Sequence, residues 1–285
     1  MIRIITDTAS DFTPEEALEQ NITLLPIPIQ FGEKSYLDKY ELSTDDFYSR
    51  LIESDDLPKT SQITPYTFLQ EFEKVREAGD SAVVIVMSGE LSNTAQNAMQ
   101  AALDFDNIHV VDSKNVTIGE YCLIQLALKL RGEGRDAKDI ADELLRQRER
   151  IRVIALLDTL EYLKKGGRIS ATTAWAGGLL AIKPVVSVTD GKVLVVGKAR
   201  GSRNGNNMLM ELVEKSGGID FSVPYRLGYS GLERSLLNKY IADSKKLWEG
   251  HSDDVSLPVL QIGCTIGTHI GPGTVALAFF AQSSI

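Results

Sequence analysis

The sequence predicts an α/β protein whose first half is a parallel sheet flanked by helices. Short apolar runs rich in β-branched residues alternate with helix-forming segments along this half. Such alternation implies right-handed crossovers and a sheet covered on both faces. A different pattern with a hairpin signal follows, and it predicts a second α/β domain with a mixed or antiparallel sheet. We therefore expect two domains, residues 1–155 and 156–285.

The first half supplies strands and helices in regular succession. Strands are expected at 2–6, 24–31, 82–87, 108–111 and 151–157. Helices are expected after Pro14, over 43–54, from Pro65 to 78, from Ser92 onward, and over 116–131 and 136–150. Pro26 and Pro28 confine the second strand to an edge or an irregular path, because proline cannot donate to a sheet ladder.

The central strand and the residues after it predict a ligand site. The apolar run 82–87 closes on Ser88-Gly89, and Ser92 stands where the N-cap of the next helix is expected. Its hydroxyl and the following N–H groups then point into a strand-to-helix turn. Such turns lie at the carboxyl ends of parallel strands, where ligands usually bind and anions are favoured.

The second half contains shorter and less regular elements. Asp158 and Glu161 resemble a capping box, and the short helix after them ends at Gly166-Gly167. The remaining expected elements are a helix-like stretch at 168–180, a hairpin at 184–197 turning at 190–191, helices at 204–215 and 231–248, strands at 226–229, 258–262 and 274–280, and a glycine-rich loop at 263–273.

Composition and charge exclude several classes of function. The chain has 30 basic and 39 acidic residues, a net charge of −9, so no nucleic-acid partner is expected. No apolar run reaches membrane-spanning length and the first residues lack an apolar signal region, so we expect a soluble cytoplasmic protein. The three histidines are scattered, which predicts no metal site, and neither a phosphate-binding loop nor a dinucleotide fingerprint occurs.

Seven motifs spread over the whole chain resemble those of the DegV family of fatty acid-binding proteins, which includes the binding subunit of bacterial fatty acid kinase. They are TDTASD near the start, KTSQ at 59–62, MSGELSNT at 87–94, VVDSK at 110–114, LEYLKKGGRIS at 160–170, IKPVVSVTDGKV at 182–193 and GTHIGPG at 267–273. The resemblance implies a two-domain DegV-like fold that encloses one long-chain acyl group.

The resemblance also implies a ligand set. By motif position, Thr60 and Ser92 would bind the carboxylate, His269 would lie close to it, and Arg168 would support the head-group network. The acyl tail would lie in an apolar tunnel. In kinase-linked members a separate ATP-binding subunit phosphorylates the bound carboxylate. The implied protein is thus a lipid-binding protein rather than an enzyme, with no catalytic residue, cofactor or metal of its own and a fatty acid kinase subunit as partner.

Two departures from the family pattern bear on this reading. Asn93 replaces a glycine after Ser92, and Ala95 replaces an aromatic residue. The segment 198–207, where the family carries a denser basic run that meets the kinase, retains Lys198, Arg200 and Arg203. The kinase partner is therefore implied less directly than the lipid.

Each site residue also has a purely structural interpretation. Ser92 can be a plain helix cap and Thr60 a turn hydroxyl. Arg168 can form a surface ion pair or brace the domains, and His269 can be a buried residue with a satisfied hydrogen bond.

A second class of function stays open, a hydrolase of acyl or phosphate esters. Ser92 would be its nucleophile and His269 its base, although Ser92 lacks the G-x-S-x-G elbow and no acidic partner can be assigned. Cys264 follows an apolar run in a glycine-rich segment, which is typical of a small packed residue rather than a nucleophile.

Overall fold

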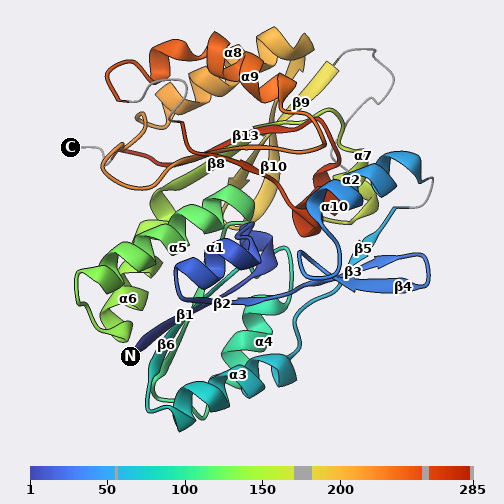
Figure 1. Ribbon diagram of the computed structural model, residues 1–285. Helices are drawn as coiled ribbons and strands as arrows, with labels where there is room; N and C mark the ends of the chain where they lie inside the picture. Colours follow the sequence, from blue (N-terminus) through green and yellow to red (C-terminus); the bar gives the residue numbers. More distant parts are fainter. Residues whose placement is uncertain (55–56, 170–181, 252–256, 283–285) are drawn as a thin grey trace.

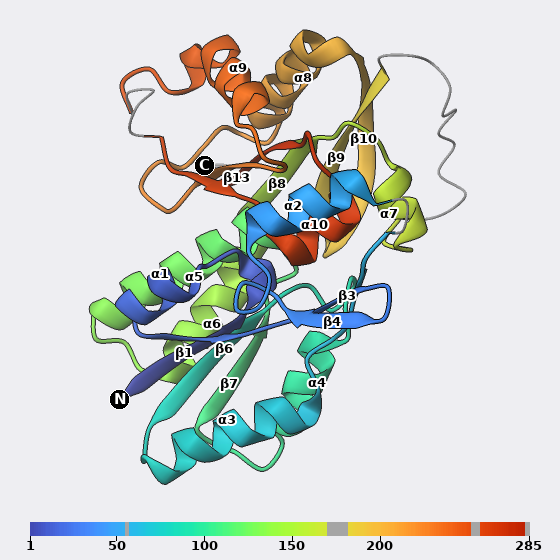
Figure 2. The ribbon, with the colours of Figure 1, turned by 45° about the vertical axis from the view of Figure 1, so that its right-hand side comes forward.

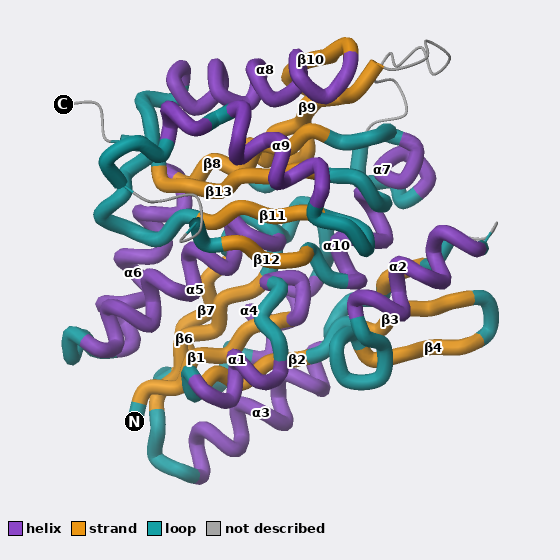
Figure 3. Tube along the Cα trace, turned by 45° about the horizontal axis from the view of Figure 1, so that its top comes forward, coloured by secondary structure: helices purple, strands orange, loops and turns teal. Residues whose placement is uncertain are grey.

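The computed structural model describes residues 1–54, 57–169, 182–251 and 257–282. Two sheets lie one above the other, and helix α5 (Thr117–Gly132) lies between them (Figure 1). Helices α8 (Gly201–Lys215) and α9 (Ser235–Asp243) cover the outer face of the larger sheet (Figure 3). Because α5 packs against strands of both sheets, most of its side chains are buried, which its largely apolar sequence allows.

The smaller main sheet is parallel, as the sequence predicts. Its order is β2-β1-β6-β7, with β1 (Ile2–Asp7), β2 (Ile22–Leu25), β6 (Ser81–Val86) and β7 (Ile108–Asp112). Every residue of β6 after Ser81 is buried, as expected of a strand covered on both faces. Figure 2 shows helices on both sides of this sheet.

Besides α5 and α2 (Thr44–Glu53), the first half contains the helices α1 (Pro14–Glu19), α3 (Pro65–Glu77), α4 (Thr94–Ala101) and α6 (Ala137–Gln147), with short 3-10 turns at Thr8–Ser10 and Arg148–Arg150. Thr64 caps α3 by accepting from the Thr67 amide, and Pro65 occupies its first position.

The expected strand 24–31 is divided between two sheets. Its first residues belong to β2, and after Pro26 the chain enters β3 (Pro28–Phe31). This strand forms a separate three-stranded sheet with β4 (Lys34–Leu37) and β5 (Lys59–Thr60), next to α2 (Thr44–Glu53). The chain thus takes the irregular path that the sequence predicts from Pro26 and Pro28, and Thr60 lies in a short strand rather than a loop.

The larger sheet is mixed. Its order is β10-β9-β8-β13-β11-β12, with β8 (Ile151–Leu156), β9 (Ile182–Thr189), β10 (Lys192–Arg200), β11 (Arg226–Tyr229), β12 (Val259–Gln261) and β13 (Val275–Phe280). Only β11 and β12 pair in parallel among these strands. Strand β8 therefore does not extend the parallel sheet, because its partners come from the second half. The division of the chain into domains near residue 155 stays a prediction.

Three local expectations for the second half were wrong. Helix α7 (Glu161–Lys165) has Leu160 rather than Asp158 at its N-cap, without a capping side chain. The glycine-rich segment contains a helix, α10 (Cys264–Ile270), and the helix expected at 231–248 is shortened to α9 and a 3-10 turn at Lys245–Leu247. The stretch expected at 168–180 lies mostly outside the described residues.

The two halves share one hydrophobic core. Ile4 and Val84 of the parallel sheet belong to the same buried cluster as Val186 and Ala276 of the larger sheet. A second cluster lies beneath α8 and α9. At the tip of the β9–β10 hairpin, the Ser88 hydroxyl donates to the Gly191 carbonyl at 2.8 Å. The halves therefore meet through packed contacts, and no helix within the described ranges is long and apolar enough to cross a membrane.

Candidate ligand site between the two sheets

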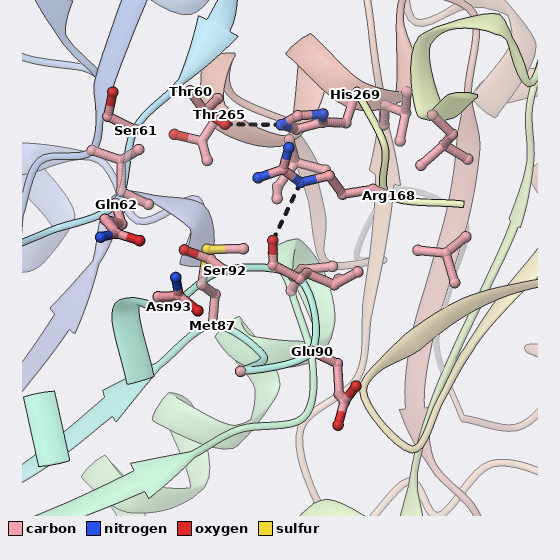
Figure 4. Close-up of a pocket in the computed structure, with 18 residues that line it drawn as sticks. Thr60, Ser61, Gln62, Met87, Glu90, Ser92, Asn93, Arg168, Thr265 and His269 are labelled. Carbon is pink, nitrogen blue, oxygen red and sulfur yellow. Dashed lines mark hydrogen bonds between the residues drawn. The ribbon is translucent and has the colours of Figure 1, made fainter. Parts of the chain in front are cut away.

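A cavity of about 620 Å³ opens between the two halves. Figure 4 shows Thr60, Ser92, Arg168 and His269 on its wall, so the structure brings together all four residues that the sequence singles out. They come from β5, from the turn before α4, from the segment after α7, and from α10. The structure therefore places the four residues on one cavity wall, whereas their roles in ligand binding stay predictions.

His269 is bonded to Thr60. The distance between Thr60 Oγ1 and His269 Nε2 is 2.9 Å, while His269 Nδ1 is buried without a hydrogen-bond partner. Burial lowers the pKa of His269 to about 4, and the charge of Arg168 adds to this effect. The ring is therefore neutral at pH 7.

The unpartnered Nδ1 favours one tautomer of the neutral ring. A proton on Nδ1 would be a buried donor without an acceptor, which is costly. With the proton on Nε2, His269 donates to the oxygen of Thr60. The hydroxyl hydrogen of Thr60 is then left to point elsewhere, and Thr60 lines the cavity. This arrangement makes Thr60 a donor to a ligand.

Ser92 is not the N-cap of α4, so that prediction was wrong. The N-cap is Asn93, whose side chain makes no capping bond, because a turn in which the Ser92 amide donates to the Ser88 carbonyl delays the helix. The Ser92 hydroxyl lies 2.9 Å from Thr94 Oγ1 and accepts from the Thr94 amide at 3.3 Å. It keeps a position on the cavity wall beside Asn93.

Arg168 joins the two halves through backbone carbonyls. Its Nε donates to the Leu91 carbonyl at 3.2 Å, and its Nη1 donates to the Gly166 carbonyl at 2.6 Å. No ion pair of Arg168 is found among the described residues. The guanidinium therefore brings a positive charge to the cavity wall without a salt bridge to any described carboxylate.

A second, apolar cavity adjoins the first. A smaller cavity of about 50 Å³ lies against the inner face of the larger sheet, where Val153, Val186 and Ala276 line it. The residues that line both cavities are Val116, Leu163, Val193, Ile266 and Ile270. The site thus has a polar mouth and an apolar interior, which suits an amphipathic ligand.

Buried carboxyl groups hold the start of α10, and sequence reasoning missed this function. Asp11 Oδ1 accepts from the Gly263 amide at 2.7 Å, and Asp38 Oδ2 accepts from both the amide and the hydroxyl of Thr265, at 3.2 and 2.5 Å. The side chain of Lys39 is also buried, with its Nζ 3.6 Å from Asp11 Oδ1. The motif TDTASD contains Asp11, but nothing in it indicates this partner.

Burial also raises the pKa values of three acidic side chains near this region. Burial raises the pKa of Asp7 to about 7 and that of Asp11 to about 6. Asp7 also accepts from the Met87 amide at 2.9 Å, which ties β1 to the end of β6 beside the cavity. Burial raises the pKa of Glu120, on α5, well above its usual value.

Metal binding and thiol chemistry receive no support from the described side chains. Among them, no group of three or more histidine, cysteine, aspartate or glutamate residues could hold a metal ion. Cys264 is buried, its Sγ faces the Leu42 and Ser43 carbonyls, and burial raises its pKa far above the usual range. It therefore remains a protonated thiol.

Comparison with known proteins gives one consistent result. The model of the DegV family, described as a family of uncharacterised proteins, matches residues 1–282. A DegV domain-containing protein of Clostridium perfringens is 33% identical over 285 residues, covering 99% of both chains. Another, from Caldanaerobacter subterraneus, is 30% identical over 280 residues and covers 98% of both chains.

Solved structures agree with the family comparison. A DegV family protein from Thermus thermophilus, described by its fatty acid binding, has a TM-score of 0.86, 26% identity and 99% coverage of both chains. A fatty acid-binding DegV family protein from Streptococcus agalactiae has a TM-score of 0.84 and 28% identity, again over 99% of both chains.

Proposed function

The chain belongs to the DegV family, and from this premise we propose that it binds one long-chain fatty acid between its two halves. The observation that carries the proposal is the single cavity in which Thr60, Ser92, Arg168 and His269 meet at the polar end of an apolar space. Relatives described as fatty acid binding support it. The proposed domains, 1–155 and 156–285, would close on the ligand from either side.

The polar mouth suits a carboxylate. A carboxylate only accepts hydrogen bonds, so its partners must be donors. Thr60 has its hydroxyl hydrogen left over after accepting from His269, and Ser92 can rotate its hydroxyl away from Thr94. Arg168 supplies positive charge nearby. Donors and charge together bind the head group without a metal or cofactor.

The apolar interior supplies most of the affinity. Burying each CH₂ contributes about 0.8 kcal/mol, so a chain of roughly sixteen carbons gains about 10 kcal/mol before ordering costs. The small cavity against β8, β9 and β13 gives the direction of the tail. Its volume of about 50 Å³ requires side chains to move apart when the tail enters. The head group would thus set orientation and the tail would set strength.

We further propose that the bound acid is presented to a separate ATP-dependent kinase, which forms the acyl phosphate. The resemblance to kinase-linked members supports this step. Arg200 and Arg203 lie exposed near the start of α8, where cations can meet an acidic partner. We propose a cytoplasmic location, because handover to such a kinase requires ATP.

The hydrolase alternative is less well supported. His269 is bonded to Thr60 rather than to Ser92, and its Nδ1 has no acid to orient it. A serine nucleophile needs a base within reach and a partner that positions the base. We therefore prefer the binding function.

Mass spectrometry of an organic extract of the purified protein tests the proposal. We expect a long-chain fatty acid in near-equimolar amount, and an extract without one, followed by no binding of added palmitate, would contradict it. In delipidated protein, Ser92→Ala should weaken binding of palmitate about 10–150-fold, because one hydrogen bond to a charged group contributes about 1.5–3 kcal/mol. Palmityl alcohol lacks the carboxylate, so Ser92→Ala should reduce its affinity less.

A further inference from the structure

One hydroxyl deep in the apolar interior has no partner. Thr274, just before β13, is 1% exposed, and its Oγ1 makes no hydrogen bond. Its backbone is satisfied independently, since its amide donates to Ser230 Oγ at 2.9 Å and its carbonyl accepts from the Ser230 amide at 3.1 Å. The hydroxyl of Thr274 therefore takes no part in holding this turn.

The described side chains around Thr274 provide no free hydrogen-bond partner for its hydroxyl. Thr274 lines the small cavity, and the only other polar side chain there among the described residues is that of Thr117. The hydroxyl of Thr117 is already committed, because it donates to Asp11 at 2.5 Å. A buried water needs two to four polar partners, and this space provides at most one that is free. A water molecule is therefore a poor occupant.

Threonine at this position needs a reason beyond packing. Valine has nearly the same shape and is equally suited to the start of a strand, but it has no hydroxyl to desolvate. A buried hydroxyl without a partner destabilises the protein. A ligand atom that paired with Oγ1 would remove this penalty only in the bound state.

The location connects this hydroxyl to the acyl ligand. Ile266 and Ile270 line both the cavity with the polar mouth and the cavity at Thr274, so a tail that enters from the mouth can reach the space that Thr274 lines. We propose that the preferred ligand is a fatty acid carrying an oxygen, as a hydroxyl or keto group, partway along its chain. That oxygen accepts a hydrogen bond from Thr274 Oγ1. The inference rests on the proposed fatty acid binding.

The contrast between two variants isolates the hydroxyl. Thr274→Val keeps the shape of the side chain and removes the hydroxyl, whereas Thr274→Ser keeps the hydroxyl and removes a methyl group. Delipidated wild type, Thr274→Val and Thr274→Ser are titrated with stearic acid and with a series of hydroxystearic acids in which the hydroxyl moves along the chain. Their dissociation constants are then compared.

We expect wild type to bind one or two adjacent positional isomers about tenfold more tightly than stearic acid, a difference of about 1.4 kcal/mol. Thr274→Ser should keep this preference and Thr274→Val should lose it. The midpoint of thermal unfolding of ligand-free Thr274→Val should also rise by about 2–4 °C, because the unpaired hydroxyl is gone.

Two failures can be told apart. If wild type binds stearic acid but prefers no isomer, or if Thr274→Val retains the preference, the role of Thr274 is overturned and fatty acid binding stands. If no acid of the series binds to the wild type, both proposals are overturned. Should Thr274→Val not fold, the wild-type series and Thr274→Ser still decide.

Discussion

The two ends of α10 carry polar groups of opposite character. Near its last residue, His269 has an unpartnered Nδ1, and its partner Thr60 lines the cavity. At its start, Asp11 accepts from the Gly263 amide and the Thr117 hydroxyl and lies near the buried ammonium of Lys39. Buried polar groups that are well paired hold structure, whereas groups with spare capacity are available to a ligand.

The difference explains how a helix of seven residues can present a site. Helix α10 (Cys264–Ile270) has no capping side chain of its own at Gly263. Its first amides are instead satisfied by Asp11 and Asp38, which lie more than 200 residues earlier in the chain. We therefore regard Asp11 and Asp38 as the tether that fixes the start of α10, and the end that carries His269 as the part that α10 presents to the ligand.

Removing the tether should have the largest effect. Asp11→Ala leaves the Gly263 amide without its acceptor and the Lys39 ammonium buried without its counter-charge. Breaking a buried pair in this way costs about 3–5 kcal/mol, measurable as a lower free energy of unfolding in urea. Glu133→Gln, at an exposed position after α5, serves as control and should change little. An Asp11→Ala protein as stable as the control would show that α10 does not depend on this tether.

The pH dependence of stability should differ in sign between the buried acids and His269. The pKa of Asp7 is about 7 and that of Asp11 about 6 when folded, against 3.8 as the ordinary value, so the unfolded chain releases these protons first. Their contribution to stability is present below about pH 4 and is lost as the pH rises through 6 to 7. His269, with its pKa lowered to about 4, contributes stability above pH 6.5 that is lost as the pH falls toward 4.

Urea unfolding between pH 4.5 and 7.5 separates these contributions, at about 1.4 kcal/mol for each unit of pKa difference. His269→Gln should make stability fall more steeply with rising pH, because the opposing contribution is removed. Asp7→Asn should tilt the profile the other way. The neighbouring charges Asp38, Glu120, Lys39 and Arg168 remain in both variants. If the slope of unfolding free energy against pH changed in the same direction in both variants, the opposite contributions of His269 and the buried acids would be contradicted.

Local sequence signals predicted much of the fold. Thr64 and Pro65 indicated the start of α3, and Asp190-Gly191 forms the turn of the β9–β10 hairpin with positive φ at both residues. These features depend on neighbours in the chain. The helix α10 and the placement of β8 depend instead on partners distant in sequence, so no local pattern contained them.

The candidate site also combines features that the sequence predicted with features that it did not. Motif order was enough to single out Thr60, Ser92, Arg168 and His269, which the structure brings to one cavity. It did not indicate that His269 pairs with Thr60, nor that Asn93 rather than Ser92 caps α4. Nor could sequence alone distinguish the hydroxyl of Thr274 from any other threonine, since its lack of a partner is a property of the packed interior.

The smallest effect concerns the close approach that keeps His269 in place. A Cβ added at Gly166 would lie 2.3 Å from His269 Nδ1, so Gly166→Ala must displace the ring and disturb its bond to Thr60. Overpacking of this kind costs about 1–3 kcal/mol. Gly132→Ala, at the end of α5 with nothing within 4 Å of the added Cβ, is the matched control.

Two measurements distinguish displacement of the ring from a general loss of packing. NMR titration of His269 should show its pKa moving from about 4 toward 6.5 in Gly166→Ala, because the displaced ring is less buried. Affinity for palmitate should fall, while affinity for palmityl alcohol changes less, because Thr60 loses its orientation toward the carboxylate. If Gly166→Ala loses stability like an overpacked protein but keeps the pKa of His269 and its preference for the acid, the neutral histidine does not orient Thr60. In that case the polar mouth would owe its geometry to Ser92 and Arg168 alone.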